Sequence, residues 1–120
     1  MRILGFSKGE EIRKPLIVCL CGSTRFMETF HEAARRETLK GKIVLTVTDI
    51  SKYSKATDAQ LNNPELKKML DELHLCKIDL ADEVLVLNVG GYIGESTRNE
   101  IAYAIKTGKV IHYWEYLLGQ

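Results

Sequence analysis

Residues 15–25 read Pro-Leu-Ile-Val-Cys-Leu-Cys-Gly-Ser-Thr-Arg, a short apolar run that ends in a glycine and two hydroxyl side chains. A continuous apolar run of this length is typical of a strand that is buried on both faces of a parallel sheet. Later runs at 42–47, 83–89 and 109–113 are also rich in Val, Ile and Leu. Together with 16–21, they predict four strands of one sheet.

Segments of helical period separate these runs and predict the crossover helices of a parallel sheet. The first helix is predicted over about 25–40, and Gly41 follows where a left-handed residue often ends a helix. The second begins with Asn63 as its cap and Pro64 at its first position, and it reaches about Ala81. The third ends before Gly108 in the same way as the first.

This alternation predicts an α/β fold, with one flavodoxin-like or Rossmann-like three-layer domain at 15–120 and a four- or five-stranded parallel sheet. Residues 1–14 are expected to form either an edge strand or a loose arm. The polar stretch at 50–62 is longer than a usual connection, so we expect a lid or binding loop that is mobile without ligand.

The composition limits the classes of function. The 120 residues suffice for one core, and 17 Lys and Arg balance 16 Asp and Glu, so no global positive field favours duplex nucleic acid. Any anion site must therefore be local. Cys19, Cys21 and Cys76 lack Cys-x-x-Cys spacing, which argues against disulfides and against a metal site. No signal sequence or membrane span is visible, and we expect a cytoplasmic protein.

The loops that follow the strands hold the candidate site residues, because ligands of open parallel sheets bind beyond the carboxyl ends of the strands. After the first strand, Gly22, Ser23 and Arg25 lie where a helix begins, and free backbone N–H groups there favour a phosphate or carboxylate. The alternative is that Ser23 or Thr24 only caps the helix and that Arg25 lies in solvent. These residues alone leave both interpretations open.

The segment 90–100, Gly-Gly-Tyr-Ile-Gly-Glu-Ser-Thr-Arg-Asn-Glu, is the most distinctive in the chain. Glycines such as Gly94 let the backbone approach a ligand closely, and Tyr92 can stack on a nucleobase. Thr97 and Glu100 also fit a Thr-x-x-Glu capping box, which would give both side chains a purely structural use. The chain has neither Gly-x-x-x-x-Gly-Lys-Ser/Thr nor Gly-x-Gly-x-x-Gly, which disfavours nucleotide kinases and classical dehydrogenases.

Five motifs in the chain carry a resemblance to a known group of enzymes. They are Ile-Val-Cys-Leu-Cys-Gly-Ser-Thr-Arg at 17–25, Val-Leu-Thr at 44–46, Ala-Asp-Glu-Val-Leu-Val at 81–86, Asn-Glu-Ile-Ala-Tyr-Ala at 99–104 and Gly-Lys at 108–109. Over residues 16–113 the chain resembles the nucleoside 2-deoxyribosyltransferase superfamily, and its Cys-Gly-Ser-x-Arg opening is most similar to the 2'-deoxynucleoside 5'-phosphate N-hydrolases. The resemblance implies that Ser23 and Arg25 hold a 5'-phosphate and that Glu100 is the catalytic carboxylate. It implies no metal or organic cofactor.

The chain differs from that family at two places. Eight residues before Asp82, where the family usually has an aspartate, it has His74. His74 could donate a proton to the leaving base or bind the sugar 3'-hydroxyl, and a half-buried histidine without ligand contact is the alternative. The loop before Glu100 is longer than in the family, and it brings Ser96 as a second candidate phosphate ligand. The isolated His31 and His112 are expected to be structural.

The sequence therefore predicts an N-glycosidase acting on 2'-deoxynucleoside 5'-monophosphates, in which Glu100 stabilises the positive charge on C1' or attacks that carbon. Base exchange between deoxynucleosides, and a non-catalytic nucleotide-binding or sensor module, are the alternatives. The aromatic residues at 113–118 predict a chain end that is covered, and the resembled enzymes form oligomers. We therefore expect a homodimer.

Overall fold

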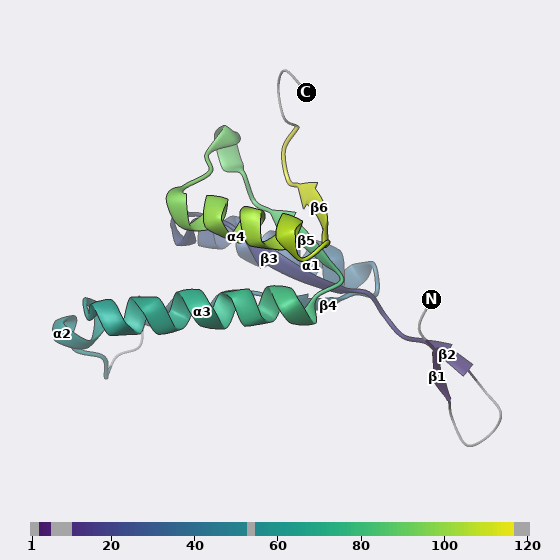
Figure 1. The fold of residues 1–120 in the computed structure, drawn as a ribbon, viewed down its shortest axis with the longest axis horizontal. Helices are drawn as coiled ribbons and strands as arrows, with labels where there is room; N and C mark the ends of the chain where they lie inside the picture. The colour runs from purple at the N-terminus through teal and green to yellow at the C-terminus, as the bar shows by residue number, and fades with distance from the viewer. Residues whose placement is uncertain (1–2, 6–10, 53–54, 117–120) are drawn as a thin grey trace.

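The computed structural model describes residues 3–5, 11–52 and 55–116. Four strands form one all-parallel sheet: β3 (Ile17–Cys21), β4 (Ile43–Leu45), β5 (Glu83–Val86) and β6 (Val110–Tyr113), in the order β4-β3-β5-β6 (Figure 1). Each strand lies inside one of the four apolar runs that predicted it. The predicted α/β class is therefore confirmed, and within the described residues the sheet has four strands rather than five.

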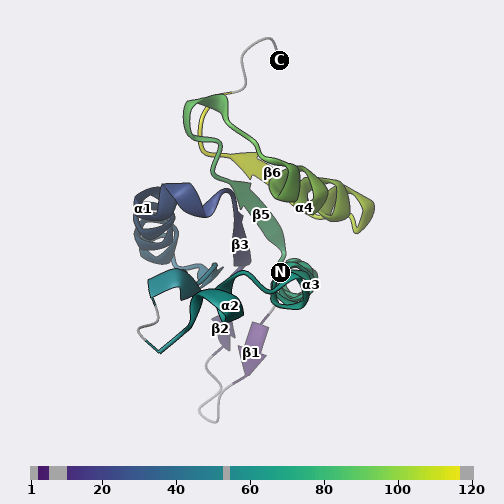
Figure 2. The same cartoon turned by 90° about the vertical axis from the view of Figure 1, so that its left-hand side faces the viewer.

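Helices cover both faces of this sheet and complete three layers (Figure 2). Helix α1 (Met27–Leu39) lies on one face, and α3 (Pro64–Leu80) and α4 (Glu95–Lys106) lie on the other. Alternate residues of β3 supply the two cores, because successive side chains of a strand point to opposite faces. Val18 and Leu20 pack with α1, whereas Cys19 and Cys21 pack on the side of α3 and α4.

The helix ends follow the predicted signals. Asn63 caps α3, with its side chain accepting from the backbone N–H of Glu65 at 2.8 Å, and Pro64 is the first residue of the helix. Gly41 and Gly108, which follow α1 and α4, have φ angles of 82° and 73°, the left-handed region in which glycine is unstrained. The predicted ends of α1 and α4 are confirmed.

The start of α4 differs from the capping-box alternative. The helix begins at Glu95 with Gly94 at the cap position, and no side chain caps it. Thr97 is therefore already inside the first turn, where it is buried. The capping box of Thr97 and Glu100 is wrong, and Glu100 has no such structural use.

The polar stretch at 50–62 contains more regular structure than a loop. It holds a 3₁₀ turn, η2 (Ile50–Lys52), and a short helix, α2 (Asp58–Leu61), while residues 53–54 lie outside the described part. Thr57 and Gln60 form a reciprocal capping box at the start of α2. The expected lid or binding loop therefore contains local helical structure, because capping gives α2 a helical start, and its mobility without ligand stays a prediction.

The N-terminal residues form a separate antiparallel hairpin, made of β1 (Ile3–Gly5) and β2 (Glu11–Arg13). It projects away from the three-layer domain (Figure 1). The described residues of the 1–14 segment therefore add no edge strand to the parallel sheet.

The aromatic chain end is partly covered by the same chain. Trp114 is half-buried against the core on the α1 side, and the guanidinium of Arg36 lies 4.2 Å from the centre of its ring. The backbone N–H of Glu115 donates to Asn88 Oδ1 at 2.8 Å. Tyr116 is exposed, and Leu117 and Leu118 lie outside the described residues. Trp114 therefore needs no partner subunit to cover it.

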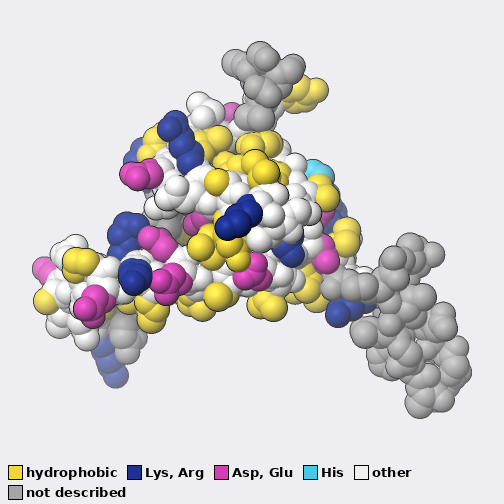
Figure 3. All heavy atoms as spheres, in the orientation of Figure 1, with side chains coloured by type: hydrophobic (Ala, Val, Ile, Leu, Met, Phe, Trp, Pro, Cys, Tyr) yellow, Lys and Arg dark blue, Asp and Glu magenta, His cyan; other side chains and the backbone are white. Residues whose placement is uncertain are grey.

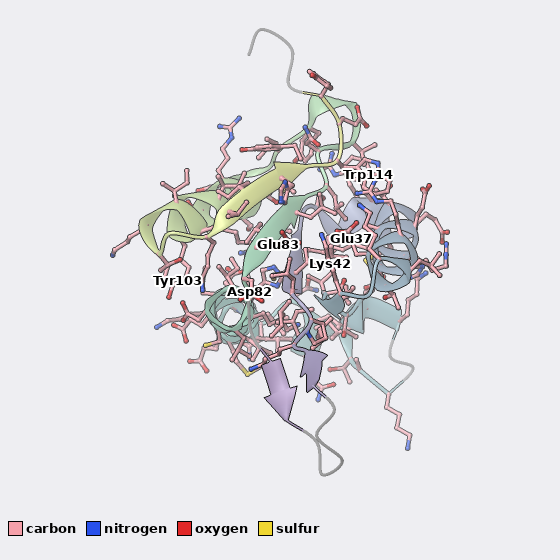
Figure 4. All side chains as sticks on the ribbon, turned by 90° about the vertical axis from the view of Figure 1, so that its right-hand side faces the viewer. Glu37, Lys42, Asp82, Glu83, Tyr103 and Trp114 are labelled. Atoms are coloured by element: carbon pink, nitrogen blue, oxygen red, sulfur yellow. The ribbon has the colours of Figure 1, made fainter. Side chains whose placement is uncertain are left out.

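A buried charge network holds the amino ends of the strands (Figure 4). Lys42, just before β4, pairs with Glu37 of α1 at 3.0 Å and with Glu83 of β5 at 2.5 Å. His112 of β6 reaches the other oxygen of Glu83 at 3.2 Å, which agrees with the structural role expected for it. These charges lie at the edge of the sheet away from the loops expected to bind a ligand.

Candidate active site

A pocket of about 850 Å³ opens beyond the carboxyl ends of β3 and β4. The first crossover leads from β3 to β4 on one side, and the next returns to β5 on the other side of β3, so the strand order reverses here. Open α/β sheets bind their ligands at such a point, and this volume suits a small molecule. The lining includes the loop after β3, the end of α2, one face of α3 and the start of α4 (Gly22, Ser23, Thr24, Leu61, Asn63, Leu70, His74, Lys77, Ser96 and Glu100).

Glu100 lies in the second turn of α4 and faces α3. Its side chain is 14% exposed, and it also lines a smaller adjoining cavity with Asp71 and Asn99. Burial raises the pKa of Glu100 above its ordinary value of 4.5, although His74 and Cys21 act to lower it. The chain therefore offers one largely desolvated carboxylate to the pocket.

His74 reaches the same point from the middle of α3. Its Nε2 atom lies 3.8 Å from Glu100 Oε1, and the residue is 5% exposed, so it is buried more deeply than the half-buried alternative supposed. Burial acts to lower the pKa of His74, but the Cys19 thiol and the charge of Glu100 outweigh it and raise that pKa. The two residues predicted to be catalytic are 26 positions apart in the sequence and adjacent in the structure.

Two cysteines complete this cluster, and the sequence analysis gave them no role in it. Cys19 Sγ lies 3.7 Å and Cys21 Sγ 3.4 Å from His74 Nε2, and both residues are fully buried. A hydrogen bond with Cys21 lowers the pKa of Cys19 to about 6 against the opposing effect of burial, while the same bond and burial raise that of Cys21. The signal for their proximity was their Cys-x-Cys spacing, which places both on one face of a strand.

The loop after β3 brings Gly22 and Ser23 to the pocket. Gly22 is close to the backbone after β5, since a Cβ atom there would lie 3.2 Å from the Cβ of Leu87. Ser23 Oγ accepts from the backbone N–H of Arg25 at 3.3 Å and so caps the short 3₁₀ helix η1 (Thr24–Phe26). Ser23 thus has the predicted local capping contact and also lies on the pocket wall.

Arg25 does not belong to the pocket lining in this structure. Its guanidinium lies over the ring of Tyr92, 4.2 Å from the ring centre, and both side chains are exposed. Gly94 packs beneath the same ring, where an added Cβ would be 3.2 Å from the Tyr92 hydroxyl. The structure therefore brings together Gly22, Ser23, His74, Ser96 and Glu100, and it keeps Arg25, Tyr92 and Gly94 in a separate group beside them.

Two lysines of α3 line the pocket and were missed by the sequence analysis. Lys77 donates to the backbone carbonyl of Thr46 at 2.6 Å, and Lys67 pairs with Asp71 at 2.8 Å near the mouth. Their positions on the α3 face could have been derived from helical spacing relative to His74, since Lys67 and Lys77 lie seven and three residues away. Among the described residues, Lys67 and Lys77 are the lysines of the pocket lining, and both have protein partners in this structure.

Neither models of known protein families nor curated protein sequences gave a match to this chain. Among the described residues, no helix is both long and apolar enough to cross a membrane. On the face shown in Figure 3, acidic and basic side chains are interspersed and form no broad patch of one sign. The function must therefore be argued from the geometry of the pocket.

Proposed function

We propose that this chain is an N-glycosidase that cleaves the bond between base and deoxyribose in 2'-deoxynucleoside 5'-monophosphates. The observation that carries this proposal is the approach of Glu100 and His74 to 3.8 Å on the wall of the pocket at the strand-order reversal. A carboxylate next to a proton-carrying imidazole can supply the two functions that glycosidic cleavage uses, a nucleophile and a general acid.

The chemistry assigns one role to each of these two side chains. Glu100 attacks C1', the C1'–N bond breaks, and its electron pair leaves with the base, which takes a proton from His74. Water then hydrolyses the glycosyl ester and restores the carboxylate. The low exposure of Glu100 favours this chemistry, because a carboxylate with few water neighbours interacts strongly with the positive charge that develops on the sugar.

The phosphate-binding part of the proposal rests on the loop after β3. Ser23 lies on the pocket lining at the start of η1, and Ser96 lies on the same lining at the start of α4. Arg25 follows Thr24 directly, and it reaches the mouth of the pocket only if its side chain leaves the ring of Tyr92. A phosphate would supply the charge that favours this rearrangement, since charge-assisted hydrogen bonds are stronger than an exposed cation–π contact.

Base exchange between deoxynucleosides is the second candidate, and the position of Arg25 favours it. With Arg25 over the ring of Tyr92, a phosphate in the pocket has one cationic partner fewer, which favours a neutral nucleoside over a nucleotide. In that case the acceptor for the glycosyl group is a second nucleobase instead of water. The volume of about 850 Å³ accommodates either acceptor.

We also propose that the enzyme works as a homodimer in the cytoplasm, where its cysteines stay reduced. Support comes from α3, which exposes Met69, Leu73 and Leu80 on one face at 53%, 49% and 67% of their areas. Hydrophobic side chains gather along the edge of the molecule formed by this helix (Figure 3). Apolar side chains at this spacing are suited to packing against a second helix.

The test is incubation of the purified chain with each deoxynucleoside 5'-monophosphate and each free deoxynucleoside, with chromatography to detect free base. We expect base release, faster from monophosphates than from nucleosides. Addition of a second base then distinguishes hydrolysis from exchange, because only exchange yields a new nucleoside. Binding of nucleotides without any base release would instead make the chain a nucleotide sensor and contradict the proposal.

A further inference from the structure

Two thiols and a carboxylate converge on His74 Nε2. Cys19 Sγ, Cys21 Sγ and Glu100 Oε1 lie 3.7, 3.4 and 3.8 Å from it. Both sulfur atoms are within hydrogen-bonding distance, but one ring nitrogen has a single lone pair or proton to share between them, and 3.8 Å exceeds the length of an N–H···O bond. Hydrogen bonding therefore does not explain the convergence of all three atoms.

We propose that Cys19, Cys21 and His74 bind a divalent cation of the zinc type and that Glu100 completes its tetrahedral coordination. The ligand atoms of the first three residues all lie within 4.8 Å of one another. The site goes beyond the proposed glycosidase function and does not depend on it, because it rests only on the positions of these four side chains.

The two distances between cysteine and histidine agree with tetrahedral coordination of a single ion. At a tetrahedral angle, bonds from zinc of about 2.3 Å to sulfur, about 2.0 Å to nitrogen and about 2.1 Å to oxygen put sulfur and nitrogen about 3.5 Å apart, and nitrogen and oxygen about 3.4 Å apart. The two cysteine–histidine distances, 3.7 and 3.4 Å, fall within about 0.2 Å of the first value. Glu100 Oε1 lies 3.8 Å from His74 Nε2 but outside the group of ligand atoms within 4.8 Å of one another, so the Glu100 carboxylate must turn toward the ion to become the fourth ligand.

The donor set selects the class of metal. Two thiolates and one imidazole favour zinc and its neighbours among the transition metals, whereas Mg²⁺ and Ca²⁺ prefer oxygen ligands throughout. The sequence prediction of no metal relied on the absence of Cys-x-x-Cys spacing. It missed this arrangement because a strand brings residues two positions apart to the same face, and α3 supplies the third ligand from 53 residues further along the chain.

Metal binding and the proposed catalysis use the same atoms in different ways. A bound ion occupies His74 Nε2 and an oxygen of Glu100, so neither group is free to act on a sugar. The metal-bound chain is therefore the inactive form of the proposed enzyme, and the metal-free chain is the active form. The ion also joins β3, α3 and α4 and should raise the melting temperature of the domain.

The experiment uses the full chain without an affinity tag, treated with a chelator and titrated with Co²⁺ under reducing conditions. We expect the intense visible and near-ultraviolet bands of tetrahedral cobalt with thiolate ligands, saturating at one ion per chain and abolished by one equivalent of Zn²⁺. Cys19→Ser and Cys21→Ser should each weaken binding by about tenfold or more. Cys76→Ser is the matched control, because Cys76 is free and exposed, and it should bind like the wild type.

Two results would overturn the proposal. One is the absence of thiolate bands when the folded wild-type chain is saturated with cobalt. The other is loss of the bands in Cys76→Ser with retention in Cys19→Ser. If a variant at a buried cysteine unfolds, the melting temperature of the wild type decides the question, since it must rise with Zn²⁺ and must not rise with Mg²⁺. These readouts need no turnover, so a chain that binds zinc and releases no base would contradict the proposed function alone.

Discussion

Apart from Glu100, His74 is the residue whose substitution best distinguishes a catalytic role from a structural one. His74→Gln should lower the rate of base release by about 10²-fold or more if the imidazole is the general acid, and most for bases that leave only when protonated. His31→Gln is the matched control, because His31 is exposed on α1. The rate is measured by chromatography after metal removal. Small losses of rate that are equal for all bases would mean that His74 has only a structural role.

The proposed preference for substrates that carry a phosphate depends on Arg25. Arg25→Ala should weaken monophosphate substrates by about tenfold to a hundredfold, since each charge-assisted hydrogen bond contributes roughly 1.5 to 3 kcal/mol, and it should leave free nucleosides unchanged. KM for both substrate classes is the measurement, with Arg35→Ala on α1 as the control. Equal losses for both classes would mean that Arg25 only holds Tyr92 and the loop.

Individual site residues could be predicted where a motif on the chain carries them. Glu100, Ser23 and His74 lie on the pocket, as the motifs and their spacing indicated. Two contacts could not be predicted, because they depend on how distant segments meet. The sequence does not show that the Arg25 guanidinium lies over the ring of Tyr92, nor that Cys19 lies beside His74. The two residues of each pair are more than 50 positions apart in the chain.

Glu37, near the end of α1, stabilises the packing of that helix at the amino ends of the strands. Burial alone would raise the pKa of Glu37, but hydrogen bonds from Lys42, Lys40 and Arg36 outweigh it and lower the pKa to about 2. A carboxyl whose pKa is depressed in the folded state stabilises that state above its unfolded pKa and loses this effect as the pH falls. The relevant window lies between the ordinary value of 4.5 and about 2.

The unfolding free energy should therefore fall as the pH decreases from 5 to 2, and Glu37 should account for up to about 3 kcal/mol of that fall. Denaturant titrations of the wild type and of Glu37→Gln at both pH values are the measurement. The variant should already be less stable at pH 5 and should show a flatter dependence on pH. Parallel curves for the two proteins would contradict the assigned role of this network.

The four strands of the sheet and the helices α1, α3 and α4 were predictable in type and order, because apolar runs and helical period depend on local sequence. The strands β4 and β5 are shorter than the runs 42–47 and 83–89, because Val47 and Leu87 lie past the strand ends and are apolar since they pack in the core on the α1 side. The cap residue of α4 was predicted wrongly for a different reason. Gly94 occupies the cap position, so Thr97 lies within the first turn, where it is buried.

At the scale of the whole molecule, the proposed dimer should form through the exposed face of α3. Met69→Glu places a charge on that face, outside the pocket lining, and should convert a dimer into a monomer in sedimentation experiments. Glu72→Gln, on the same helix, should leave the dimer intact. A wild-type chain that sediments as a monomer at all concentrations would contradict the proposal of a homodimer.

Glu100 performs the chemistry in the proposed mechanism, and base release by Glu100→Gln is the decisive measurement. The substitution keeps the shape of the side chain and removes its charge, so we expect a folded variant that still binds a deoxynucleoside monophosphate and releases no measurable base. Glu72→Gln, measured beside it, should match the wild type. Normal base release by a folded Glu100→Gln chain would show that Glu100 is not the catalytic carboxylate.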